Sequence, residues 1–304
     1  AQGFQTTHAT AERVAKALGC SAGDVLVCST GLIGEQLDRD KILAGVDASA
    51  ASLSEDGGLA AAEAIMTTDS VSKTASAEGS GWVIGGMAKG AGMLAPGLAT
   101  MLVVITTDAQ LPSGELDLAL RQATRVTFDR LDSDGCMSTN DTVTLMASGA
   151  SGVQPSLQEF TAVLTEVCRD LAMQLLADAE GSTHDIAIEV INAASEDDAV
   201  MVGRSLARNN LFKAAVFGND PNWGRILAAV GTTTAEFDPY DIDVSINVVS
   251  VSRKGEPDQS RELVDMTPRR VDILISLNAG KKAATVFTSD LTHAYVTENS
   301  EYSS

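Results

Sequence analysis

A threonine between a glycine-rich loop and an apolar run is the residue of this sequence best placed for covalent chemistry. Glycines crowd the stretch 85–97, and the apolar run 101–105 begins directly after Thr100. Such a run predicts a buried strand, whereas glycine lets the backbone before it approach another group closely. We therefore interpret Thr100 as a candidate nucleophile. We interpret the Ala99–Thr100 bond as a candidate for self-cleavage, which would make Thr100 a new N-terminus.

Two other interpretations of this stretch stay open. It can be a glycine-rich turn before a buried strand and nothing more. Gly90, Gly92 and Ala95 also fit the phosphate-binding pattern G-x-G-x-x-G/A. That pattern should follow a strand and open a helix, and Pro96-Gly97 would interrupt a helix here, which argues against phosphate binding.

Longer motifs make the chain resemble the glutamate N-acetyltransferase family, also called the ornithine acetyltransferases of arginine biosynthesis. The resemblance rests on the segments Lys89–Met93, Ala99–Leu102, Thr107–Ala109 and Asp220–Arg225, together with Pro96. It implies self-cleavage between Ala99 and Thr100 into chains of residues 1–99 and 100–304. Family members usually carry a further N-terminal segment, which this chain is expected to lack.

The same resemblance assigns roles to single residues. Thr30 and Gly31 would form an oxyanion hole. The substrate-binding residues would be Thr67, Lys89, Thr100, Glu180, Asn299 and Ser304. Simpler interpretations exist: Ser-Thr-Gly can be an ordinary turn, Thr67 can cap a helix, and a chain end is normally frayed. Glu180 would be an unfavourable charge at a helix C-terminus, which favours a role in binding, and His184 stands where the family usually has Lys.

The implied reaction moves an acetyl group from N-acetylornithine to Thr100 and then to glutamate. A free α-amine has a pKa of about 8 and could serve as the base for its own threonine hydroxyl. Lys89 would contact a substrate carboxylate and Glu180 the amine of ornithine. No cofactor is needed, although some family members also use acetyl-CoA. The resemblance implies an αββα sandwich and an α2β2 assembly. A threonine-dependent amidase or aminopeptidase, and a ligand-binding domain with an intact chain, remain alternatives.

Composition limits the partners of the protein. The net charge of −20 over 304 residues argues against nucleic acid and anionic membranes. Four cysteines without C-x-x-C spacing and three scattered histidines predict neither a metal site nor a disulfide framework. We expect buried free thiols in a cytoplasmic enzyme, because no signal peptide or membrane-spanning run is visible.

The elements that must position these residues follow from hydrophobic spacing. We expect helices over 7–18, 38–44, 59–66, 113–132, 156–179, 196–208 and 225–230. We expect strands over 24–29, 82–87, 101–105, 185–192, 211–217, 242–251, 271–277 and 284–289. This loose alternation predicts an α/β or α+β layered fold, with sheets between helices. The polar stretch 138–142 could orient the site or cap a helix.

Overall fold

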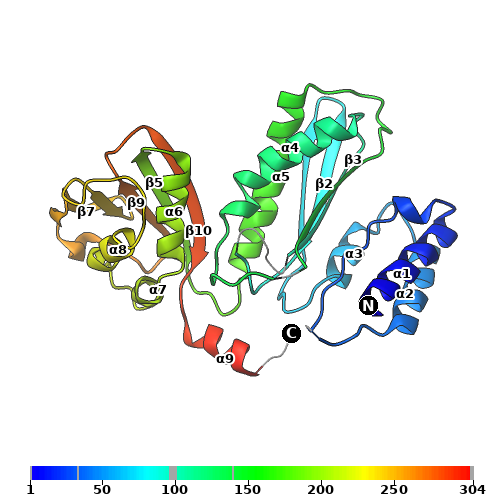
Figure 1. The fold of residues 1–304 in the computed structure, drawn as a ribbon, viewed down its shortest axis with the longest axis horizontal. Coiled ribbons are helices and arrows are strands. Elements are labelled where there is room, and N and C mark those ends of the chain that lie inside the picture. Colours follow the sequence, from blue (N-terminus) through cyan, green and yellow to red (C-terminus); the bar gives the residue numbers. More distant parts are fainter. Residues whose placement is uncertain (1, 33, 96–100, 139, 302–304) are drawn as a thin grey trace.

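The computed structural model describes residues 2–32, 34–95, 101–138 and 140–301. Figure 1 shows the first three helices at one end of the long axis and a four-stranded sheet with two helices at the centre. A six-stranded sheet with its own helices lies at the other end. The last helix runs below the junction of the centre and the six-stranded sheet, so that the C-terminal part of the chain returns towards the centre of the molecule.

Nine α-helices and ten strands are assigned within the described residues. The helices are α1 (Gln2–Leu18), α2 (Arg39–Ala51), α3 (Gly58–Ala64), α4 (Ser113–Arg125), α5 (Leu157–Ala177), α6 (Glu196–Ala207), α7 (Asn210–Phe217), α8 (Trp223–Val230) and α9 (His293–Glu301). The strands are β1 (Lys73–Gly79), β2 (Trp82–Lys89), β3 (Leu102–Thr107), β4 (Thr142–Ala147), β5 (Asp185–Ala193), β6 (Asp243–Ile246), β7 (Val249–Arg253), β8 (Glu256–Pro257), β9 (Arg270–Ser276) and β10 (Lys282–Ser289).

The central sheet has the order β1-β2-β3-β4, and the glycine-rich loop connects its strands β2 and β3. Strands β1, β2 and β3 are antiparallel neighbours, while β3 and β4 run parallel. Lys89 at the end of β2 pairs with Leu102 at the start of β3. Ile84 and Ile105 are fully buried against α5, where Phe160 and Leu164 belong to the same core. The sheet therefore holds the two ends of the glycine-rich loop side by side.

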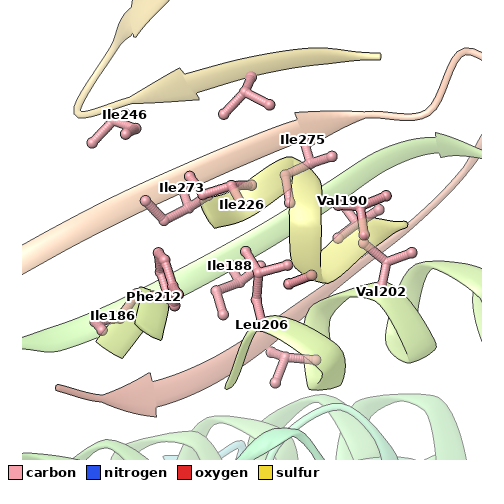
Figure 2. Packing of buried hydrophobic residues seen from close by; sticks show 14 of the residues in the cluster. Ile186, Ile188, Val190, Val202, Leu206, Phe212, Ile226, Ile246, Ile273 and Ile275 are labelled. Atoms are coloured by element: carbon pink, nitrogen blue, oxygen red, sulfur yellow. The ribbon is translucent and has the colours of Figure 1, made fainter. Parts of the chain in front are cut away.

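The second sheet has the order β10-β5-β9-β6-β7-β8. Its core is almost wholly aliphatic, as expected for a chain with 4 % aromatic residues. Figure 2 shows Val202 of α6 near Val190 of β5, and Ile226 of α8 near Ile273 of β9. Burial of such side chains contributes about 1.5–3 kcal/mol each, so this sheet forms a core of its own.

The mixed α/β class expected from the sequence is confirmed, and the two helix-covered sheets agree with the expected αββα sandwich. Three local predictions were wrong. The run 211–217 forms helix α7, which Asn209 caps by accepting a hydrogen bond from the N–H of Phe212. Residues 24–29, predicted as a strand, form none. The run 242–251 is a hairpin, because Asn247 and Val248 turn through positive φ between β6 and β7.

The cysteines are free, as expected, but only Cys168 is buried. Cys20 and Cys136 are exposed, and Cys28 is half-buried. Among the described residues, no helix combines the length and the apolar character needed to cross a membrane.

Candidate active site

Four of the predicted substrate residues lie near one end of the central sheet. Lys89 is the last residue of β2, and Glu180 follows the C-terminus of α5. Thr67 lies between α3 and β1, and Asn299 lies on α9. We call Thr67, Lys89, Glu180 and Asn299 the strand-end group. The contacts described below connect these four residues, although they come from four separate parts of the chain.

The Lys89 side chain is fully buried, and its amine has no hydrogen-bond partner among the described residues. Burial lowers the pKa of Lys89 below its ordinary value, while the nearby carboxylates of Asp69 and Asp141 raise it. A buried amine without a partner destabilises a fold, so its presence needs a reason outside the packing of the core. An anionic ligand would give this amine the partner that the described residues do not provide.

Near Lys89 lies a buried set of charged residues that the sequence analysis did not predict. The Lys73 amine lies 2.6 Å from a carboxylate oxygen of Asp69 and 2.6 Å from one of Asp178. We call these three residues the ion network. Asp69 also accepts hydrogen bonds from the backbone N–H of Gly90 at 2.7 Å and of Thr67 at 3.0 Å. Burial alone would raise the pKa of Asp69, but the bonds from Lys73, Thr67 and Gly90 outweigh it and lower that pKa.

Glu180 lies directly against the glycine-rich loop. Its backbone N–H donates to the carbonyl of Ala91 at 3.0 Å. A Cβ on Gly92 would come within 2.5 Å of the Glu180 carboxylate, so a larger residue there would displace this carboxylate. The amide of Asn299 donates to the same carboxylate at 3.0 Å. Two residues that were predicted separately as substrate ligands, Glu180 and Asn299, are therefore in direct contact.

Helix α9 is held in place by contacts at its start. Gly181 has a φ of 62°, and a Cβ there would come within 2.2 Å of the backbone nitrogen of Tyr295. The Thr292 hydroxyl donates to the carbonyl of Gly181 at 2.6 Å and accepts from the Tyr295 N–H at 3.0 Å. The chain up to Glu301 is therefore a docked helix and not a frayed end.

Thr30 and Gly31 lie in a separate place, on the segment 25–32 between the first two α-helices. They line a cavity of about 500 Å³ with residues of α1 and with Asn140. The Asn140 amide donates to the carbonyl of Ser29 at 2.8 Å. We call Thr30, Gly31 and Asn140 the loop group. It is open to solvent, because Gly31 is exposed and Thr30 is half-buried.

Asp141 connects the loop group to the start of β3. Its carboxylate accepts the backbone N–H of Met101 at 3.0 Å, and the preceding residue is Asn140. Burial raises the pKa of Asp141 to about 6, although the hydrogen bond from Met101 and the charge of Lys89 act in the opposite direction. One dipeptide thus contacts both the segment before Thr30 and the residue after Thr100. In the stretch 138–142, these two side chains contact Ser29 and Met101, and neither is seen to cap a described helix.

Ala99, Thr100 and Ser304 lie outside the described residues, as does Pro96. Their predicted roles in cleavage, catalysis and substrate binding stay predictions. His184, which stands where the family usually has Lys, is buried with its ring nitrogens 2.8 Å from a carboxylate oxygen of Asp290 and 3.1 Å from the carbonyl of Met266. Its polar contacts are thus made inside the fold.

Sequence reasoning did not point to Asp69 or Lys73, and it named Asn140 and Asp141 only as part of a polar stretch with two possible roles. One signal was available for the first two: a Lys four residues after an Asp, beside a predicted substrate threonine. The contacts of Asn140 and Asp141 join segments 40 residues or more apart, which a single sequence does not reveal. In the part of the chain that the structure describes, no group of three or more His, Cys, Asp or Glu residues could hold a metal ion.

Comparisons with known proteins extend over the whole chain. The model of the ArgJ family matches residues 1–304. Two proteins named arginine biosynthesis bifunctional protein ArgJ, from Streptomyces coelicolor and Thermobifida fusca, are 61 % and 62 % identical to this chain over 303 residues. Each alignment covers 100 % of this chain and 79 % of the relative. The crystal structure of the protein of that name from Bacillus halodurans has a TM-score of 0.62 at 35 % identity, and the match covers 66 % of this chain and 98 % of that chain.

Proposed function

Because this chain belongs to the ArgJ family, we propose that it transfers an acetyl group from N-acetylornithine to glutamate through an acetyl-Thr100 intermediate. The products are ornithine and N-acetylglutamate. ArgJ enzymes are acyltransferases of arginine biosynthesis, and their name as bifunctional proteins is consistent with a second activity that takes acetyl groups from acetyl-CoA.

The observation that carries the proposal is a pair of opposite charges beside the glycine-rich loop, one at the end of β2 and one after α5. Lys89 offers a buried amine without a partner among the described residues, and Glu180 offers a carboxylate over Gly92. Ala91, which lies two residues after Lys89, accepts the N–H of Glu180 and keeps the two segments together. N-acetylornithine has a carboxylate at one end and an ammonium group at the other, so each end meets its counter-charge. Thr67, Asn299 and Ser304 complete the binding surface in this proposal.

The proposed maturation separates residues 1–99 from residues 100–304. The Thr100 hydroxyl attacks the carbonyl carbon of Ala99, the peptide C–N bond breaks, and water hydrolyses the resulting ester. The size of the Bacillus halodurans chain supports such a cut, since nearly all of that chain corresponds to 66 % of this one. A piece beginning at Thr100 would also occupy about two thirds of this sequence.

Acetyl transfer then uses the freed amine of Thr100 as a base for the Thr100 hydroxyl. The hydroxyl oxygen attacks the acetyl carbonyl, and the oxyanion accepts hydrogen bonds from the Thr30 hydroxyl and the Gly31 N–H. Ornithine leaves with the proton, and the amine of glutamate attacks the acetyl ester in its turn. The contacts of Asn140 and Asp141 support this assignment, because they connect the segment of Thr30 to Met101.

The remaining parts of the proposal concern assembly and location. Two cut molecules, each consisting of one α and one β chain, form an α2β2 assembly, which binds neither nucleic acid nor membranes and needs no cofactor for the exchange reaction. The free cysteines fit a reducing compartment, and we place the enzyme in the cytoplasm.

The test is the dependence of N-acetylornithine turnover on glutamate. The purified protein should produce ornithine and N-acetylglutamate in equal amounts, and only when glutamate is present. A denaturing gel of the same sample should show two fragments. Release of free acetate without glutamate would favour the amidase, and one uncut band without turnover would favour the ligand-binding domain.

A further inference from the structure

The ion network is bonded to the start of the glycine-rich loop, at Gly90. The Asp69 carboxylate accepts the N–H of Gly90, the residue directly after Lys89, at 2.7 Å. The Lys73 amine then connects Asp69 to Asp178 through two contacts of 2.6 Å. The chain after β2 is thereby tied to the end of α5 through charged groups that are buried or nearly so.

A second set of contacts closes this connection into a ring. Asp178 lies two residues before Glu180, whose N–H returns to the loop at the carbonyl of Ala91. The Glu180 carboxylate also lies close to Gly92, so the same two segments approach each other at a second point. Asp178 is also anchored by the backbone N–H of Ser70 at 2.9 Å. The position of Lys89 relative to Glu180 is therefore set by a closed series of contacts.

We propose that the ion network is a positioning device that fixes the separation between the Lys89 amine and the Glu180 carboxylate, and so selects substrates by the length of the amino-acid side chain. This rests on the proposed function, in which these two groups bind the two ends of N-acetylornithine. A substrate one methylene shorter or longer cannot reach both counter-charges while that separation is held.

Burial makes the ion network suitable for this role. The side chains of Asp69 and Lys73 are fully buried, and that of Asp178 is 8 % exposed. Exposed ion pairs contribute little to stability and rearrange easily, whereas a buried pair cannot exchange its partner for water. Asp69 also fixes the backbone of Thr67. One carboxylate thus positions two predicted substrate residues, Thr67 directly and Lys89 through its neighbour Gly90.

The test compares three substrates with the wild-type protein and with Asp69→Asn. The substrates are Nα-acetylornithine and its homologues with one methylene fewer and one methylene more. Discrimination of one methylene is typically about 10–200-fold in an enzyme site. We expect Asp69→Asn to reduce the preference for Nα-acetylornithine in kcat/KM by at least about tenfold. This change should come from KM, with kcat altered by less than about threefold.

A matched control separates positioning from stability. Glu196→Gln removes ion pairs with Arg125 and Arg130, which lie outside the strand-end group. It should lower the melting temperature but leave the substrate preference within about twofold of the wild type. Asp178→Asn should shift the preference in the same direction as Asp69→Asn, and it replaces that variant if Asp69→Asn does not fold.

The outcomes distinguish the inference from the function on which it rests. A folded Asp69→Asn or Asp178→Asn protein with the wild-type preference would overturn the positioning role, even if its melting temperature fell. A wild-type protein that does not convert Nα-acetylornithine in the presence of glutamate would instead refute the proposed function.

Discussion

The strand-end group and the loop group are built on different foundations. Lys89 ends a strand with neighbours on both sides, and Glu180 follows a 21-residue helix whose inner face is fully buried. Thr30 and Gly31 belong to a segment without regular structure that is held by the Asn140 bond to Ser29. The first group is positioned by buried charges and the second by hydrogen bonds near the surface.

This difference teaches how the proposed reaction divides its work. Groups that recognise the two charged ends of a substrate must keep a fixed separation, and secondary structure with a buried ion network provides it. Donors for an oxyanion act at one point, the reacting carbonyl, and do not have to keep a fixed distance from a second binding group. Loops carried by a rigid scaffold often supply such groups. Variants of the loop group should therefore change kcat, and variants of the strand-end group should change KM.

The largest effect is expected from the residue that both groups serve. Thr100→Ala should leave one uncut chain on a denaturing gel and no measurable acetyl transfer, because the hydroxyl attacks in both reactions. Thr100→Ser keeps a hydroxyl and should retain cleavage and some turnover. Two fragments of the expected masses from Thr100→Ala would show that another group cuts the chain.

Thr30→Val tests the loop group, since valine keeps the shape of threonine and removes the hydroxyl. Loss of one oxyanion donor typically costs about 10²–10³ in kcat, and KM for N-acetylornithine should change little. Steady-state kinetics on fully cut protein separates the two constants. A change confined to KM would move Thr30 from the oxyanion hole to substrate binding.

Glu180→Gln tests the strand-end group, for which we expect a change in KM and not in kcat. Losing a charge-assisted hydrogen bond should cost about 1.5–3 kcal/mol, which is roughly 10–100-fold in KM for N-acetylornithine. Self-cleavage should proceed as in the wild type. Asn299→Ala removes only the amide that bonds this carboxylate, so it should have a smaller effect of the same kind. Unchanged kinetics in Glu180→Gln would remove Glu180 from the site.

The smallest expected effect is on stability: Lys89→Met should be slightly more stable than the wild type, although it should lose substrate binding. The pKa of Lys89 is lowered in the folded chain, so the folded protein disfavours the charged amine that the unfolded chain tolerates. Removing the buried amine should raise the free energy of unfolding by about 1 kcal/mol at pH 7.

The stability difference between the wild type and Lys89→Met should depend on pH. The destabilisation by Lys89 is complete below its folded pKa and disappears as the pH approaches the unfolded value of about 10.5. Urea unfolding of both proteins at pH 7 and pH 10 should therefore show a gap that narrows at the higher pH. A Lys89→Met protein that is less stable at pH 7 would show that Lys89 supports the fold.

The sequence predicted residue types and many elements, but not the contacts that connect them. Motifs pointed to Lys89 and Glu180, and hydrophobic spacing located most of β2 and α5. The Asp69–Gly90 and Asn299–Glu180 contacts join segments 21 and 119 residues apart, and no local pattern encodes such pairings. The error at 211–217 has a local cause, because a short apolar run fits a strand and a buried helix equally well. The Asn209 side chain caps the first turn of this segment and so favours the helix.

The pairing of β2 with β3 has a consequence for the thermodynamics of the cut protein. These strands lie on opposite sides of the Ala99–Thr100 bond, yet they share six residue pairs in one sheet. Trp82, Ile84 and Ala88 of the first piece are buried in the same core as Phe160 and Leu164 of the second. Before the cut, unfolding is unimolecular. After the proposed cut, unfolding would also separate two molecules, so mass action would make the denaturation midpoint rise with protein concentration. The cut would thus turn a single folding unit into an obligate pair.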